Sequence, residues 1–225
     1  MLCHWFWLLM VSENFMSDET LNMTGYHGTS SEKAQNIFES GFTSKTVKIN
    51  DLKKDLLPKF PCDLGNGIYF FLDVEEKGFD GIKNACDYVQ AFKIKEIEYS
   101  IIKAVISLGP GDKGLNFNDE RFVNNFLKFR SQFSQRLDIL IESHEKLRKY
   151  KSQDRALARG NCDGIFIEMY IDNFQLKPVF VLKDTFTKFD QNYKVSSFPN
   201  GREIVVREER IIKNKEICKV FKRNK

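Results

Sequence analysis

The sequence predicts an α+β domain in which strands form the core and helices lie around it. Short runs of β-branched and aromatic residues occur at both ends of the chain, and helical patterns gather early and in one central segment. No glycine-rich phosphate-binding pattern opens a helix after a strand, so an alternating parallel sheet is not indicated. With 225 residues, 42% of them hydrophobic and 29% charged, we expect a single domain over residues 1–225.

The first half of the chain alternates short strands with helices. Residues 24–27 predict a strand, after which Ser30 or Ser31 caps a helix that Gly41 ends. Between this helix and the next strand, residues 43–62 predict a polar loop or a short helix. Further strands are expected at 67–72 and 100–108, separated by a helix at 83–92.

A long amphipathic pattern occupies about residues 119–159, within an insertion at about 115–159. Its large apolar residues recur at steps of three and four and one step of seven, a gap that His144 fills, which indicates one long helix or a helical hairpin; they are Phe122, Phe126, Phe129, Phe133, Leu137, Leu140 and Leu147. We expect this helical insertion to cover the β core, with His144 packed within the stripe. The alternative is that part of the stripe binds a partner helix or a nucleic acid. After it, strands are predicted at 163–169, 178–182 and 203–207.

Positive charge is concentrated in two segments of a chain whose net charge is +4. Residues 127–159 hold nine Lys and Arg against four acids, and the basic C-terminal tail, residues 213–225, holds six against one. Such clustering attracts polyanions, although a charge run is more commonly a solvated face. The five cysteines are odd in number and widely spaced. This argues against a disulfide or zinc framework and favours a reducing, cytoplasmic compartment.

The apolar N-terminal residues 1–10 (MLCHWFWLLM) predict neither a signal peptide nor a membrane span. The run is too short to cross a bilayer, and no basic residue precedes it. We expect it to pack on the domain as a strand or helix, with no membrane contact. The alternative is a non-native extension, since Met16 opens a polar segment that is itself a plausible start.

Three separated motifs hold residues suited to chemistry. In the first, residues 25–30 (GYHGTS), a histidine at a strand end precedes a glycine that a flat ligand can approach and small hydroxyl residues. The second, residues 64–71 (LGNGIYFF), combines with Tyr88 of the next helix to supply two aromatic rings able to sandwich a planar heterocycle. The third, residues 200–207 (NGREIVVR), places Glu203 at the mouth of a late strand.

The order of these motifs resembles that of the ADP-ribosyltransferases of the H-Y-E type, the branch that contains diphtheria toxin and the poly(ADP-ribose) polymerases. The likeness covers residues 24–92 and about 160–212, whereas the insertion at 115–159 has no counterpart. It implies a split antiparallel β core with peripheral helices, and NAD as substrate without a metal. A chain of this size without a targeting or zinc-finger domain looks like bacterial toxins and phage-defence effectors, which implies transfer of a single ADP-ribose unit.

The resemblance assigns the first motif to NAD binding. His27 would hydrogen-bond the adenosine-side ribose, and the backbone of Gly28 would pair with the nicotinamide carboxamide. Thr29 or Ser30 would assist through a hydroxyl group. Ala85 stands where many members of the family have a serine that bonds the carboxamide.

The other two motifs would hold the nicotinamide and its ribose. Tyr69 would stack on the nicotinamide ring, with Tyr88 as the second stacking tyrosine. Glu203 would bond the nicotinamide ribose and stabilise positive charge as it develops there, and with His27 and Tyr69 it completes the implied catalytic set. Glu168 and Gln175 are rivals for this position, but Glu168 lacks the Gly-x-Glu context and Gln175 suits relatives with an amide there.

The acceptor of ADP-ribose stays open. The two basic segments and the rings of Phe122, Phe126 and Phe129 slightly favour RNA or DNA over protein. Basic surface also suits an acidic partner, such as an antitoxin or another neutralising protein. Two other hypotheses are an inactive module of this fold that binds NAD, ADP-ribose or a protein, and an RNA 2′-phosphotransferase, which would need arginines in its pocket.

Overall fold

The computed structural model describes residues 19–44, 46, 48, 61–92, 97–143, 161–189 and 196–222. The expectations for residues 1–15, for His144 and for residues 223–225 lie outside these ranges, as does most of the segment predicted as a polar loop or short helix at 43–62.

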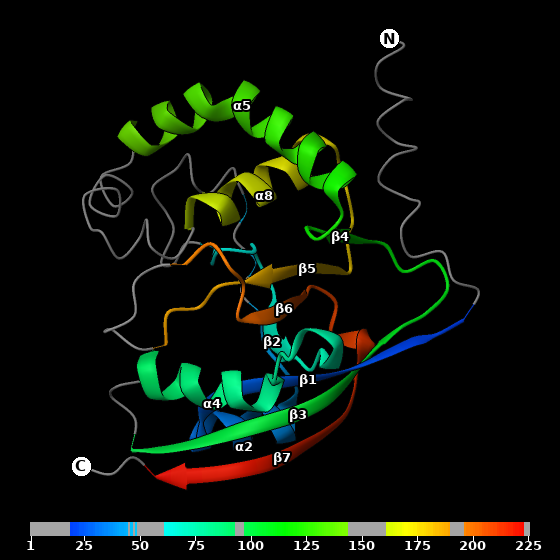
Figure 1. The fold of residues 1–225 in the computed structure, drawn as a ribbon, viewed down its shortest axis with the longest axis vertical. Coiled ribbons are helices and arrows are strands. Elements are labelled where there is room, and N and C mark those ends of the chain that lie inside the picture. The colour runs from blue at the N-terminus through cyan, green and yellow to red at the C-terminus, as the bar shows by residue number, and fades with distance from the viewer. Residues whose placement is uncertain are drawn as a thin grey trace.

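A seven-stranded mixed sheet forms the centre of the α+β fold (Figure 1). Its strands lie in the order β4-β5-β6-β2-β1-β3-β7, and only β4 and β5 pair in parallel. The bounds are β1 Leu21–Ser30, β2 Ile68–Leu72, β3 Glu98–Leu108, β4 Gly114–Asn116, β5 Phe180–Thr185, β6 Gly201–Val206 and β7 Ile212–Lys222. The helices are α2 Ser31–Ser40, α4 Gly81–Phe92, α5 Glu120–Ser143 and α8 Asn161–Asn173, with 3-10 turns η1 Glu75–Lys77 and η2 Glu209–Ile211.

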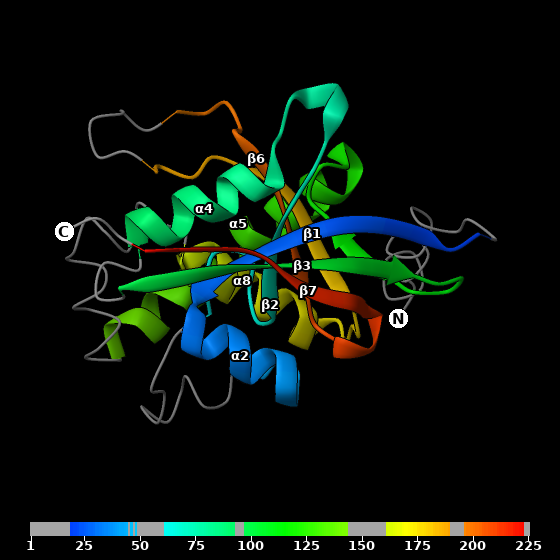
Figure 2. The same cartoon turned by 90° about the horizontal axis from the view of Figure 1, so that it is seen from below.

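The sheet is divided where β1 meets β2. Strand β1 pairs with β3 through ten consecutive residue pairs, from Leu21 to Ser30. It pairs with β2 only through Gly25 and Tyr26, which lie opposite Leu72 and Phe71. The preceding residues of β2, 68–70, pair with β6 alone. Figure 2 shows the consequence: β1, β3 and β7 run across the direction of β5 and β6. Two half-sheets therefore share one short contact.

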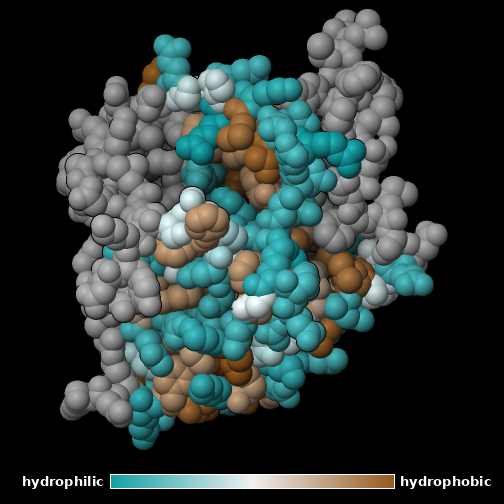
Figure 3. All heavy atoms as spheres, in the orientation of Figure 1, coloured by the Kyte–Doolittle hydropathy of each residue, from teal (hydrophilic) through white to brown (hydrophobic). Residues whose placement is uncertain are grey.

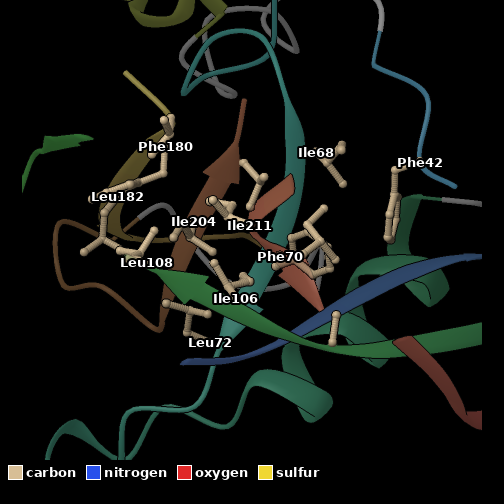
Figure 4. Packing of buried hydrophobic residues seen from close by; sticks show 14 of the residues in the cluster. Phe42, Ile68, Phe70, Leu72, Ile106, Leu108, Phe180, Leu182, Ile204 and Ile211 are labelled. Atoms are coloured by element: carbon tan, nitrogen blue, oxygen red, sulfur yellow. The ribbon is translucent and has the colours of Figure 1, made fainter. Parts of the chain in front are cut away.

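Helices cover the faces of both half-sheets. In Figure 2, α4 and α2 lie on opposite sides of β1, β3 and β7, while Figure 1 shows α8 between α5 and the other half-sheet. Ala34 of α2 packs with Ile102 and Ala104 of β3, and Ala85 and Val89 of α4 pack on the other side. Figure 4 shows part of the core on the α2 side, including side chains from β2, β3, β5 and β6. Exposed apolar residues form several separate groups on the face shown in Figure 3.

Residues 163–169 are helical and not the strand that their apolar run predicts. They belong to α8, and its residues 165–171 are all buried because the helix lies between α5 and the sheet. A helix that is apolar on every side has no 3.6-residue alternation to distinguish it from a buried strand. The short apolar run therefore led to the wrong element.

The insertion predicted at about 115–159 begins in β4 and is helical over Glu120–Ser143, and the described N-terminal part of its apolar stripe is core. Phe122, Phe126 and Phe129 of α5 are all buried, and each makes an edge-to-face contact with Tyr170 of α8. Their rings cannot stack on nucleic-acid bases, so that part of the argument for a nucleic-acid acceptor is wrong. No helix within the described ranges is long and apolar enough to cross a membrane.

Strand β7 contains most of the predicted basic tail. Residues 213–222 pair with β3, and β7 is the last strand on that side of the sheet. Lys213, Lys219 and Lys222 are exposed along it, whereas Lys215 is half-buried. Lysines on an edge strand discourage pairing with another chain, which gives this positive charge a structural use.

Candidate functional site

The three motifs are brought together at the centre of the sheet. The first lies on β1, the second leads into β2 and the third forms β6, and these strands are neighbours in the order β6-β2-β1. Phe71 of β2 connects them, since it pairs with Tyr26 on one side and Glu203 on the other. Side chains of paired residues share a face. Glu203 and Tyr26 therefore lie on the face that α4 covers.

Glu203 is a buried carboxyl group with one of its two oxygens fixed. Its side chain is on the same face as that of Lys183, its pairing partner in β5, and the residue is only 7% exposed. The hydroxyls of Thr185 and Thr187 donate to Oε1 over 2.6 and 3.3 Å. Among the described residues, none donates a hydrogen bond to Oε2.

Burial and a neighbouring acid favour the protonated form of Glu203. Loss of solvation raises the pKa of Glu203 above the ordinary carboxyl range, and the negative charge of Asp63 raises it further. The two threonine hydroxyls and the Lys183 ammonium act in the opposite direction. Burial also raises the pKa of Asp63, which lies in the loop before β2. The site thus has two carboxyl groups that resist simultaneous ionisation.

Tyr69 lies on the same face as Glu203, two residues before Phe71 in β2. Its ring packs against the core formed by α5 and α8. Its hydroxyl donates to the carbonyl of Gly65 over 2.9 Å and accepts from the backbone N–H of Leu64 over 3.0 Å. Burial raises the pKa of Tyr69 well above its ordinary value. The Tyr69 hydroxyl therefore holds the loop at Leu64 and Gly65, and the proposed stacking on nicotinamide would involve the ring alone.

His27 lies on the other face of the sheet from Glu203. Successive residues of a strand point to opposite faces, and its ring contacts Phe70 and Phe42 at centroid distances of 5.8 and 5.4 Å. Its Nδ1 is 2.8 Å from the carbonyl oxygen of Tyr69. The histidine thus bridges β1 and β2 where their strand pairing has ended.

Gly28 is closely covered by α4. A Cβ atom at this position would lie 2.6 Å from Cγ1 of Val89 and 2.7 Å from the carbonyl oxygen of Ala85. Close packing against α4 therefore explains why glycine occupies this position without any need for a ligand. Its backbone lies in the part of β1 that has left β2.

The two hydroxyl residues after Gly28 are buried. Ser30 is the N-cap of α2, and its Oγ accepts from the backbone N–H of Lys33 over 3.4 Å. This confirms the cap that the sequence predicts, and it commits the Ser30 hydroxyl to the helix. Thr29 is 5% exposed and lies at the end of β1.

Tyr88 belongs to a group of aromatic rings at the C-terminal part of α4. Its ring is 6.1 Å from that of Phe71 and 5.1 Å from that of Phe92. Phe189, which follows β5, contacts Phe71 from another direction at 6.2 Å. Since Phe71 pairs with Glu203, these rings gather beside the buried carboxyl group.

Glu168 has a structural partner and does not compete with Glu203. Arg207, at the end of the third motif, binds both of its carboxylate oxygens at 2.6 and 3.1 Å. The Asn66 backbone N–H also donates to Glu168 Oε1 over 2.7 Å, and Arg207 donates to the Asn66 carbonyl over 3.1 Å. This buried pair holds the loop that leads into β2. Gln175, the other rival, is exposed beyond the end of α8.

The sequence predictions missed the groups that surround Glu203. Lys183 and Thr185 lie just beyond the predicted strand 178–182, and the structure extends that strand to Thr185. Their two-residue spacing places them on one face, which is a signal that a longer strand prediction would have used. Asp63 lies before β2 in a loop, and no local pattern marks it. Within the described residues, no cluster of His, Cys, Asp and Glu is arranged to hold a metal ion.

Comparisons with known proteins find no counterpart. No family model, curated protein or solved structure matches the chain.

Proposed function

We propose that the protein is an NAD-dependent mono-ADP-ribosyltransferase, of a toxin-like kind, with a fold of the H-Y-E ADP-ribosyltransferase type. The observation that carries this proposal is the order β6-β2-β1 with pairing between β1 and β2 ending at Tyr26. The buried carboxyl group of Glu203 lies on β6, the neighbour of β2 on the side away from β1. Three motifs distant in sequence thus come from adjoining strands, with Tyr69 and Glu203 on one face of the sheet and His27 on the other.

Glu203 supplies the chemistry that cleavage of the nicotinamide glycosidic bond needs. As the bond from ribose C1′ to the nicotinamide nitrogen breaks, positive charge develops on the ribose, and both bonding electrons leave with neutral nicotinamide. The ionised Glu203 stabilises that charge through Oε2, which has no donor among the described residues. A hydroxyl of the acceptor then bonds to C1′, and its proton passes to water. The cationic nicotinamide ring of bound NAD favours ionised Glu203.

His27 would serve as a hydrogen-bond acceptor in NAD binding. Because the Tyr69 carbonyl can only accept, Nδ1 of His27 carries the proton of their 2.8 Å bond. In the neutral ring Nε2 is then an acceptor. That is the form needed to receive a hydrogen bond from a ribose hydroxyl.

The second candidate is an inactive module of the same fold that binds NAD, ADP-ribose or a protein. Specific contacts favour it: the hydroxyls of Tyr69 and Ser30 are committed to internal hydrogen bonds, and α4 covers Gly28. Turnover of NAD separates the transferase from a module that binds NAD without cleaving it.

Release of nicotinamide from NAD tests the proposed function. The purified protein is incubated with NAD, and free nicotinamide is measured alongside NAD affinity by calorimetry. We expect release, by transfer or by hydrolysis, in the wild-type protein. Binding without release would identify the inactive module in its NAD-binding form. A result with neither binding nor release would reject the transferase and leave the module only as a binder of ADP-ribose or a protein.

We propose nucleic acid as the acceptor, supported by charge alone. The exposed Lys213, Lys219 and Lys222 of β7 offer phosphate contacts. Radiolabel from NAD should then appear on purified RNA or DNA, and replacing these lysines with glutamine should weaken labelling and its salt dependence. If nuclease treatment of a labelled lysate leaves all label on protein and purified nucleic acid takes none, the acceptor is protein. Truncation before β7 is a poor test because it removes a strand of the sheet.

A further inference from the structure

The proposed reaction requires Glu203 to present one oxygen to the substrate in a fixed direction. Its Oε1 receives two hydroxyl hydrogen bonds, and both donors come from the end of β5 and the residues just after it. We propose that Thr185 and Thr187 are positioning residues that hold Oε1 of Glu203 so that Oε2 faces the substrate. This inference rests on the proposed function.

Thr185 is the closer of the two donors. Its Oγ1 is 2.6 Å from Oε1 of Glu203, within the range of the stronger hydroxyl–carboxylate bonds. Thr185 is 8% exposed and pairs with Gly201, two residues before Glu203 on the neighbouring strand. A β-branched side chain in a strand has few χ1 rotamers, so the hydroxyl keeps its direction.

Thr187 is held in place through its backbone. Its N–H donates to the Asn200 side-chain oxygen over 2.8 Å, and the Asn200 amide donates back to the Thr187 carbonyl over 2.9 Å. Asn84 of α4 in turn donates to the Asn200 carbonyl over 3.0 Å. A continuous chain of hydrogen bonds therefore links α4 to Glu203. The same helix carries the proposed stacking residue Tyr88.

The two hydroxyl bonds to Glu203 oppose neighbouring effects that favour its neutral form. Asp63 acts from the loop before β2, Tyr69 from β2 and Lys183 from β5. Burial and Asp63 favour the neutral acid, which could not stabilise a developing positive charge. The two hydroxyl donors favour the ionised form, because a carboxylate oxygen is the stronger acceptor.

The test removes each hydroxyl while keeping the side-chain shape. In Thr185→Val we expect kcat for nicotinamide release to fall about 10- to 100-fold, the effect of one hydrogen bond to a charged group, with the KM for NAD within about twofold. The pKa of the Glu203 carboxyl, measured by NMR titration, should rise. Thr185→Ser should restore both quantities. Thr187→Val should act in the same direction but less, since its bond is longer.

The outcomes separate this inference from the proposed function. Thr24→Val, a threonine of β1, is the control, and neither kcat nor the Glu203 pKa should change in it. If Thr185→Val leaves the Glu203 pKa and kcat unaltered, or if serine fails to rescue them, the positioning role is overturned. If the wild-type protein releases no nicotinamide, the proposed function fails, and the carboxyl pKa alone then decides whether the threonines hold Glu203.

Discussion

The Nδ1 atom of His27 and the carbonyl oxygen of Tyr69 are 2.8 Å apart, and their hydrogen bond joins β1 to β2 beyond the last strand pair between them. The contact is made by a side chain because the backbones have already diverged. One residue of the first motif is thereby fixed by the backbone of the second. The bond sets the tautomer of the ring and contributes to the contact between the half-sheets.

We predict that His27→Ala weakens both the fold and NAD binding. The substitution leaves the Tyr69 carbonyl without this donor, which costs about 1–3 kcal/mol of unfolding free energy. NAD affinity should fall because the proposed partner is a ribose hydroxyl present in the ground state. Urea unfolding and calorimetric titration with NAD measure the two effects. An unchanged NAD affinity in a folded variant would remove His27 from the proposed site.

Glu203→Gln should separate binding from turnover. We expect the fold and NAD affinity to be nearly preserved, because the amide is isosteric with the buried carboxyl group. The rate of nicotinamide release should fall about 10²-fold or more, since only the stabilisation of charge in the transition state is lost. Glu216→Gln, an exposed glutamate on β7, is the matched control and should keep the wild-type rate. Wild-type turnover in Glu203→Gln would reject the catalytic assignment.

The raised pKa of Glu203 predicts a loss of stability as pH rises. The unfolded chain releases the Glu203 proton near the ordinary carboxyl pKa of 4.5, whereas the folded protein retains it to higher pH. The unfolding free energy therefore falls above that value until Glu203 ionises in the folded state. Urea unfolding across this range should show a shallower decline in Glu203→Gln than in the wild type. Equal slopes in the two proteins would contradict the raised pKa.

Local patterns predicted much of the fold. The cap at Ser30 and the stop at Gly41 give α2 its observed ends. The failure at residues 163–169 has a clear cause, because all-round burial in α8 depends on α5 and the sheet and leaves no periodicity in the sequence. The aromatic stripe of α5 was correctly identified as apolar, but only packing against Tyr170 shows that its rings are inaccessible.

The candidate site was predictable only in part. The motifs name His27, Tyr69 and Glu203, and the sheet order brings their strands together. The pairing of Lys183 with Glu203 depends on strand register between β5 and β6, and Asp63 approaches from a loop that no local pattern marks. The sequence therefore identifies Glu203, whereas tertiary contacts set the pKa of its carboxyl group.

The ion pair between Arg207 and Glu168 supports the loop before β2. Arg207→Met leaves the carboxylate of Glu168 buried without its bidentate partner, and the Asn66 carbonyl loses a donor. Breaking one side of such a pair costs about 3–5 kcal/mol. We therefore expect a large fall in the urea midpoint of Arg207→Met. Arg210→Met is the matched control, because Arg210 also binds a carboxylate, that of Asp112, but is exposed, and its loss should have a much smaller effect.

A double variant shows whether the cost arises from the uncompensated charge. Glu168→Leu combined with Arg207→Met removes both charges, so it should be more stable than Arg207→Met alone. The Asn66 N–H still loses its bond to Glu168 and the Asn66 carbonyl its bond from Arg207, and the double variant should therefore remain less stable than the wild type. If both variants lose the same stability, an unpaired carboxylate is not the cause. Equal stability of Arg207→Met and the wild type would show that the pair does not anchor the loop.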